Sequence, residues 1–370
     1  MTDDNAHALL AAERREHVLA ALARDGAVRI SQLVDDLGVT PVTLRRDLAQ
    51  MEGEGLLVRV HGGAVAPKSA TVPASPPAAV TDPEPPTRTV AVLVPSLNYY
   101  WPGVVRGMEA EARARGLNVV LRGASYELQD ERPVLERIVA NDDISGLIVA
   151  PNTDTPHAQD VMQWLHESGI PTVLVERDAV TLPDGAPVES VTTDHALGAR
   201  LAARHLAALG HRRVGLVMSR NSPTSRKIAQ GWHGAVEELG LQPSPQRETI
   251  LPDRASGEFT AEVNAALDSM RDAGITGLLV HSDPEAMAVV DLALNRGISV
   301  PEDLSIIAYD DEVAQLFTPA LTAVSPPRAS VGRTAVDMLV HRMGSPDRPV
   351  HRVQLSPQLI VRASTAAPRA

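Results

Sequence analysis

Cysteine is absent from this chain of 370 residues, and aromatic residues make up only 2% of it. Without cysteine the protein has no disulfide, thiolate nucleophile or cysteine-ligated zinc, a composition that fits a reducing compartment. No apolar run is long enough to span a membrane, and the N-terminal segment lacks the basic start and continuous apolar core of a signal peptide. We therefore expect a cytoplasmic protein.

Excess positive charge is also missing, because the formal net charge is −12. This argues against a protein coated in nucleic acid, although a small DNA-reading module would be hidden in such a sum. With 44% hydrophobic residues, the chain can bury sizeable cores. Its length suggests two or three domains.

The scarcity of aromatic side chains makes one stretch conspicuous, the sequence NYYW at residues 98–101. Adjacent side chains on an extended segment or turn point in different directions, so one core cannot easily hold all three rings. We therefore expect at least one of Tyr99, Tyr100 and Trp101 to serve a purpose other than core packing.

A proline-rich stretch, APKSATVPASPPAAVTDPEPPTR at residues 66–88, divides the chain. It has seven prolines, almost no large apolar side chain and no periodicity, which is typical of a partly extended linker. The sequence thus predicts a small head over residues 1–65 and a large body over residues 89–370.

The head shows the pattern of three helices followed by a hairpin. Helical spacing of apolar residues covers 14–24, and a second short helix is expected over 30–37. A third helix has Thr40 as its N-cap and Pro41 at its first position. Its expected buried stripe is Leu44, Leu48 and Met51. With an alternating segment around two glycines at 55–65, this outline predicts a winged helix-turn-helix.

The body repeats valine-rich strands and helical segments in two consecutive series. The expected strands are residues 89–94, 118–121, 146–150 and 172–176, then 213–218, 276–281 and 304–310. Such runs are typical of buried parallel strands joined by crossover helices. Two series predict an α/β fold of two doubly wound lobes, with a ligand in the cleft at the carboxyl ends of the strands.

The head resembles the DNA-binding domain of the DeoR family over residues 13–66. The resemblance lies in VT at 39–40, TLRRDL at 43–48 and RVHGGA at 59–64. It implies that the following residues contact DNA: Thr40, Pro41, Thr43, Arg45, Arg46, Arg59 and His61. The threonines suit phosphate, the paired arginines suit phosphate or a guanine edge, and the last two suit the flanking backbone. An isolated arginine pair would be an ordinary solvated helix face. We expect Asp47 to brace a neighbouring arginine, because a carboxylate repels phosphate.

The body resembles the effector-binding domain of the LacI/GalR repressors, which shares its fold with periplasmic sugar-binding proteins. The resemblance rests on dispersed segments such as GIPTVLVERD at 169–178, VTTDHALGARLAARHLAALGHRRVGLV at 191–217 and VPEDLSIIAYDD at 300–311. It implies a ligand site made of Ser96, Asn98, Tyr99, Tyr100, Trp101, Arg226, Ser282, Asp283 and Asp310. Tyr309 is expected to pack inward, and Asp194 is either a hinge cap or a ligand contact.

The body departs from the LacI/GalR pattern at Ile228, where many relatives have a ligand-binding arginine, with Arg226 as a possible substitute. The combination of head and body also departs from the DeoR family, whose members carry a sugar-phosphate-isomerase-like body. The sequence therefore resembles a hybrid regulator.

The predicted function is a transcriptional regulator, in the first place a repressor of carbohydrate uptake or catabolism genes. It would bind operator DNA as a homodimer and a sugar or similar metabolite between its lobes, with no cofactor and no metal. The alternatives are an enzyme acting on sugars or nucleosides, and a transport binding protein. Against the enzyme, HSD at 281–283 cannot align as a triad, and the histidines lack metal-binding spacing.

Overall fold

The computed structural model divides the chain into two compact units, residues 1–83 and 84–370. The boundary falls inside the predicted linker, and residues 66–87 themselves lie outside the described part of the chain. The structure describes residues 14, 15, 17–19, 21, 22, 27–29, 33, 34, 39, 43, 44, 47, 48, 51, 57–60, 63–65, 88–124, 131–141, 143–153, 155, 157–181, 185–220, 222–246 and 248–369.

The head combines helical segments with a small antiparallel sheet. Its strands are β1 (Ala27–Arg29), β2 (Val58–Val60) and β3 (Gly63–Val65), in the order β1-β3-β2. The predicted stripe of Leu44, Leu48 and Met51 is confirmed, since all three side chains are fully buried. They pack with Val18, Leu22 and Leu57. The hairpin is confirmed as β2 and β3, and strand β1, which pairs with β3, was not predicted.

The first lobe of the body is built on a six-stranded parallel sheet in the order β17-β10-β7-β6-β4-β5. The strands are β4 (Thr89–Val94), β5 (Asn118–Gly123), β6 (Ile144–Val149), β7 (Thr172–Val175), β10 (Ser190–Thr193) and β17 (Arg352–Leu355). Helices α4 (Trp101–Ala114) and α11 (Arg328–Gly344) cover one face, and α5 (Arg132–Asn141) and α6 (Ala158–Glu167) cover the other. A short hairpin of β8 (Val180–Thr181) and β9 (Ala186–Pro187) lies outside this sheet.

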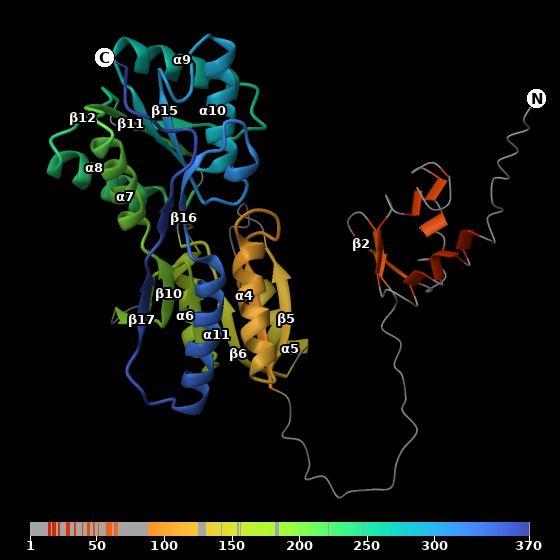
Figure 1. The fold of residues 1–370 in the computed structure, drawn as a ribbon. Coiled ribbons are helices and arrows are strands. Elements are labelled where there is room, and N and C mark those ends of the chain that lie inside the picture. Colours follow the sequence, from red (N-terminus) through yellow and green to blue (C-terminus); the bar gives the residue numbers. More distant parts are fainter. Residues whose placement is uncertain are drawn as a thin grey trace, which may run out of the picture. The chain divides into compact units, whose positions relative to one another are not determined.

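The second lobe repeats the plan (Figure 1). Its sheet has the order β12-β11-β14-β15-β16-β18, with β13 also paired to β11, and β18 is antiparallel. The strands are β11 (Arg213–Ser219), β12 (Gln242–Pro243), β13 (Thr249–Leu251), β14 (Gly277–Val280), β15 (Ser305–Tyr309), β16 (Thr322–Ser325) and β18 (Gln358–Ile360). The helices are α7 (His195–Ala208) and α8 (Ser225–Glu238) on one face, α9 (Phe259–Asp272) and α10 (Asp283–Asn295) on the other, and the short 3₁₀ helix η1 (Ala314–Leu316).

The predicted two-lobed α/β body is confirmed, and each of the seven predicted strands is a strand of the structure. The physical reason is burial on both faces, which demands a continuous apolar run rather than alternation. Strand β15, for example, is buried at every position. Polar strands such as β10 and β17 carry no such signal and were not predicted.

The chain passes between the lobes three times, at residues 193–195, 325–328 and 355–358. As a result α11 and β17 belong to the first lobe although they follow most of the second lobe in sequence. Close packing of α11 on α4 depends on glycine: a Cβ added at Gly332 would lie 2.0 Å from the Val104 carbonyl oxygen. Within the described residues, no helix is long and apolar enough to cross a membrane.

Candidate ligand pocket and DNA-binding head

A pocket of about 370 Å³ lies between the two lobes of the body, at the carboxyl ends of the strands. The first lobe contributes Tyr99, Tyr100, Trp101, Glu176 and Arg177. The second lobe contributes Ser219, Arg220, Ser222, Pro223, Thr224, Pro252, Asp253, Arg254, His281, Ser282, Pro284, Glu285 and Asp310, and His195 lies next to the first crossover. In doubly wound sheets such as these two, ligands bind outside the carboxyl ends of the strands, where the strand order reverses.

All three aromatic residues of NYYW line this pocket. Trp101 is only 1% exposed and also belongs to the core beneath α4, and its ring meets that of Tyr100 edge to face at 5.8 Å. The turn gives Tyr100 a φ of 60°, in the left-handed region. The buried Tyr99 hydroxyl faces Asp310 and Ser282 without a well-formed hydrogen bond to any described residue. Burial, together with the nearby carboxylates, raises the pKa of Tyr99.

Glu176 is the centre of a buried network that was not predicted from the sequence. Its carboxylate accepts hydrogen bonds from the Tyr100 hydroxyl at 2.5 Å and from the backbone and hydroxyl of Thr193 at 2.9 and 2.7 Å. His195 Nε2 lies 3.5 Å away. Burial alone would raise the pKa of Glu176, but His195 and these donors outweigh it and lower the pKa to about 2. The network connects the aromatic turn to the first crossover.

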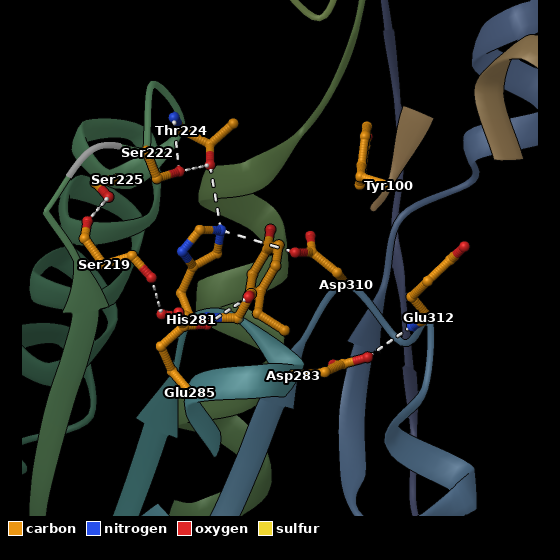
Figure 2. A network of polar contacts seen from close by, with 12 residues as sticks. Tyr100, Ser219, Ser222, Thr224, Ser225, His281, Asp283, Glu285, Asp310 and Glu312 are labelled. Carbon is orange, nitrogen blue, oxygen red and sulfur yellow. Dashed lines mark hydrogen bonds and ion pairs between the residues drawn. The ribbon is translucent and has the colours of Figure 1, made fainter. Parts of the chain in front are cut away.

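Asp310 follows strand β15 and lines the pocket, and its φ of 96° lies in the left-handed region. Its carboxylate lies 3.9 Å from His281 Nε2, and His281 in turn faces the Thr224 hydroxyl at 3.5 Å (Figure 2). Burial raises the pKa of Asp310 to about 6, against the lowering effect of His195 and Arg328. Burial also lowers the pKa of His281, to about 4. This wall of the pocket thus offers polar groups that are short of partners.

The structure separates the predicted pair Ser282 and Asp283. Ser282 lines the pocket and begins α10 with a capping box, in which Glu285 accepts from its backbone and hydroxyl at 3.1 and 2.6 Å. The Asp283 carboxylate lies outside the pocket wall and accepts hydrogen bonds from the backbone amides of residues 311–314, of which Figure 2 shows the one from Glu312. Asp283 therefore fixes the loop that follows Asp310.

Three other predicted residues lie outside the pocket wall. The Ser96 hydroxyl accepts from the Asn98 amide at 3.1 Å, which orders the turn, and the Asn98 side chain is exposed. Arg226 is exposed on α8, and neighbouring Ile228 is fully buried in the core. The pocket's arginines instead come from other elements.

Several pocket residues that the sequence reasoning missed share one signal with those it found. Glu176 and Arg177 follow β7, Arg220 follows β11, and His281 follows β14. Each is a polar residue directly after a buried strand, the same position that identified Asp310. Asp194 was left open between two roles, and its side chain accepts from the Leu197 amide at 2.8 Å as the N-cap of α7.

Tyr309 packs inward as predicted: it is fully buried, and its hydroxyl lies 3.0 Å from His195 Nδ1.

Two sets of polar contacts join the lobes beside the pocket. Lys227 of α8 pairs with Asp178 of the first lobe at 2.6 Å. Arg328, at the start of α11, binds the carbonyl oxygens of Asp310 and Asp311 and the Glu312 carboxylate. Closure or opening of the cleft must therefore alter these contacts.

Of the predicted DNA contacts in the head, Thr43 is helical and half-buried, and the backbone of Arg59 lies in β2. Thr40, Pro41, Arg45, Arg46 and His61 lie outside the described residues. Asp47 does bind an arginine, but the partner is Arg14 at 2.8 Å, in the first helical segment. Across the described ranges, no group of three acidic or histidine side chains is arranged to hold a metal ion.

Comparison with known proteins divides the chain in the same way. Residues 14–70 match the DeoR-like helix-turn-helix domain, and residues 203–365 match the periplasmic binding protein-like domain. The ribose operon repressor of Escherichia coli is 28% identical over 293 residues, covering 75% of this chain and 82% of that protein. An HTH-type transcriptional regulator in the aml 5′ region of Streptomyces limosus is 35% identical over 60% of this chain and 63% of its own length. The crystal structure of a LacI family transcriptional regulator from Enterococcus faecium with bound ribose superposes with a TM-score of 0.61, at 25% identity, over 76% of this chain and 99% of that one.

Proposed function

We propose that this chain, which joins a DeoR-like helix-turn-helix domain to a periplasmic binding protein-like domain, is a sequence-specific transcriptional regulator. The observation that carries the proposal is the coexistence of a DNA-binding type of head with an interlobe pocket that suits a small polar ligand. The relatives compared above are regulators of transcription rather than enzymes, which sets the enzyme alternative aside. In the first place we assign it the role of a repressor.

The effector in this proposal is a sugar or similar polyhydroxylated metabolite. The faces of Tyr99 and Tyr100 suit the C–H side of a sugar ring, and Asp310 and His281 suit its hydroxyls. The ribose bound to the Enterococcus faecium regulator supports this chemistry. The ligand would change DNA affinity only through its different affinities for two arrangements of the lobes.

In the head, the proposed DNA contacts remain Thr40, Pro41, Thr43, Arg45, Arg46, Arg59 and His61. We propose that two copies act together, because DNA-binding heads of this type read two half-sites. We also propose that it acts in the cytoplasm.

The test is to incubate the purified full chain with fragmented genomic DNA from its source and to sequence the retained fragments. Moderate salt suppresses nonspecific phosphate binding. We expect enrichment of a repeated half-site beside uptake or catabolic genes, which would then suggest the ligand. If no sequence is enriched, with or without candidate sugars, the proposed function is wrong.

A double variant, Arg45→Ala with Arg46→Ala, tests the recognition helix directly. We expect it to lose sequence-specific DNA binding, by at least about tenfold, because bidentate contacts to bases are worth about 1–3 kcal/mol each. Thermal unfolding of the body should not change. Full affinity of this variant for the enriched fragment would refute the assignment of these arginines.

A further inference from the structure

The most buried arginine of the described body has no carboxylate partner. Arg177 is 5% exposed, and its hydrogen bonds go only to the carbonyl oxygens of Pro151 at 3.0 Å and Glu176 at 2.8 Å. Its guanidinium lies 5.9 Å from the centre of the Trp101 ring. Buried charges are normally paired, because desolvation of an unpaired ion is costly.

Other shielded arginines of the same body follow that rule. Arg328 and Arg362 pair with Glu312 and Asp311 at 2.8 and 2.7 Å, although their side chains are more exposed than Arg177. Two further arginines, Arg342 and Arg348, share Glu189 at 2.9 and 2.7 Å. Among these arginines, the one without a carboxylate partner is Arg177, and its side chain lines the pocket.

The second lobe places two more arginines on the same pocket. Arg220 and Arg254 are exposed, and neither forms an ion pair with a described residue. They would raise the local positive potential where a ligand enters. Charge on the pocket thus comes from arginines of both lobes.

Four carboxylates also line the pocket, but three of them are already engaged. Glu176 accepts from Tyr100 and Thr193, Glu285 accepts from Ser282, and Asp253 accepts from the Ala255 amide at 2.8 Å. Asp310 remains available for ligand hydroxyls, next to His281. These neutral donors leave the negative charges in place but occupy the carboxylate oxygens, so the charged groups with hydrogen-bonding capacity left for a ligand are Asp310 and the three arginines.

We infer that the effector carries a compact oxyanion, a carboxylate or a phosphate, and that Arg177 is its binding residue. Nε and Nη1 already donate to backbone carbonyl oxygens, so the ligand would bind at the outer end of the guanidinium, where Nη2 and the second hydrogen of Nη1 form a planar pair of donors that matches either group. The neutral part of the ligand would lie toward Asp310 and the aromatic turn. This inference rests on the proposed function and narrows it from sugars in general to acidic sugars or sugar phosphates.

The experiment compares matched probes on the full chain: galactose with galacturonate, ribose with ribose 5-phosphate, and sodium chloride with inorganic phosphate. Thermal unfolding is followed by circular dichroism and binding by calorimetry, with ionic strength held constant so that general screening does not differ. We expect at least one anionic probe to stabilise the wild type more than its neutral partner. The pair that responds tells a carboxylate from a phosphate.

The variants then test Arg177 itself. Arg177→Gln should weaken binding of the anionic probe at least tenfold and remove its preference over the neutral one. Arg177→Lys, which keeps the charge and guards against a folding failure, should weaken it less, because a point charge cannot bind bidentately. Arg106→Gln, an exposed arginine of α4 outside this pocket, is the matched control and should have no effect.

The inference is overturned if no anionic probe stabilises the wild type, or if Arg177→Gln and Arg177→Lys bind the anionic probe as the wild type does. These outcomes differ from failure of the proposed function. Release of an enriched DNA fragment by a neutral sugar would leave the regulator intact and refute the anionic effector. Binding of galacturonate through Arg177 without any enriched DNA would support the anionic ligand and refute the proposed regulator.

Discussion

Replacing Asp310 by asparagine should stabilise the body while it destroys the ligand site. Burial raises the pKa of the Asp310 carboxyl from an ordinary value of 3.8 to about 6, so the folded protein binds this proton more tightly than the unfolded chain does. The Asp310 carboxyl therefore contributes to the free energy of unfolding at low pH, and this contribution is lost as pH rises through about 6. Asparagine removes the charge, and it tolerates the positive φ at this position.

The shift of about two pKa units corresponds to about 3 kcal/mol, at roughly 1.4 kcal/mol per unit. This is the expected gain in the free energy of unfolding for Asp310→Asn near pH 8. Near pH 5 the wild-type carboxyl is mostly protonated when folded, so the gain should shrink by about 1.5 kcal/mol. Loss of the carboxylate should abolish the effector response at either pH.

Urea unfolding followed by tryptophan fluorescence measures this effect on the body alone, because the three tryptophans, Trp101, Trp164 and Trp232, all lie in it. Asp291→Asn, at an exposed carboxylate of α10, is the control and should change stability little at either pH. If Asp310→Asn changes stability equally at pH 5 and pH 8, then burial of the charge is not the cause and the reasoning fails.

Two further predictions concern packing at glycines, and one concerns an ion pair. Gly332→Ala should destabilise the body by about 1–3 kcal/mol in the same urea assay, because the new methyl meets backbone that cannot rotate away. Gly234→Ala in α8, which meets nothing within 4 Å, should instead stabilise by up to about 1 kcal/mol, and equal effects would refute the packing argument. Asp47→Ala should cost the head about 1 kcal/mol by removing its ion pair with Arg14, measured by head unfolding at low and high salt, and a salt-independent loss would contradict it.

The hybrid composition and the two-lobed body were predictable from sequence, and the family comparisons and the structure confirm them. Valine-rich strands that are buried on both faces are recognisable in the sequence as continuous apolar runs. Strand β17 was not predictable in this way, because its partner β10 lies far away in sequence and its own residues are only partly buried. Its place depends on the third passage between the lobes.

For the site, the sequence predicted which residues follow the strands but not which way their side chains point. Ser282 and Asp283 are neighbours, yet one faces the pocket and the other holds a loop, and only the geometry of the α10 N-terminus decides this. Glu176 and Arg177 carried the same strand-end signal as Asp310 and were passed over. The unpaired state of Arg177 depends on distances that no sequence pattern encodes.

The three passages between the lobes also have a consequence for protein synthesis. The described core of the head ends at Leu57 and its sheet ends at Val65, so the head can fold once residue 65 has left the ribosome. The first lobe, in contrast, must wait for α11 and β17, up to residue 355, before its sheet and helix layer are whole. A prematurely terminated chain would therefore keep the folded head and lose the ligand pocket of the body.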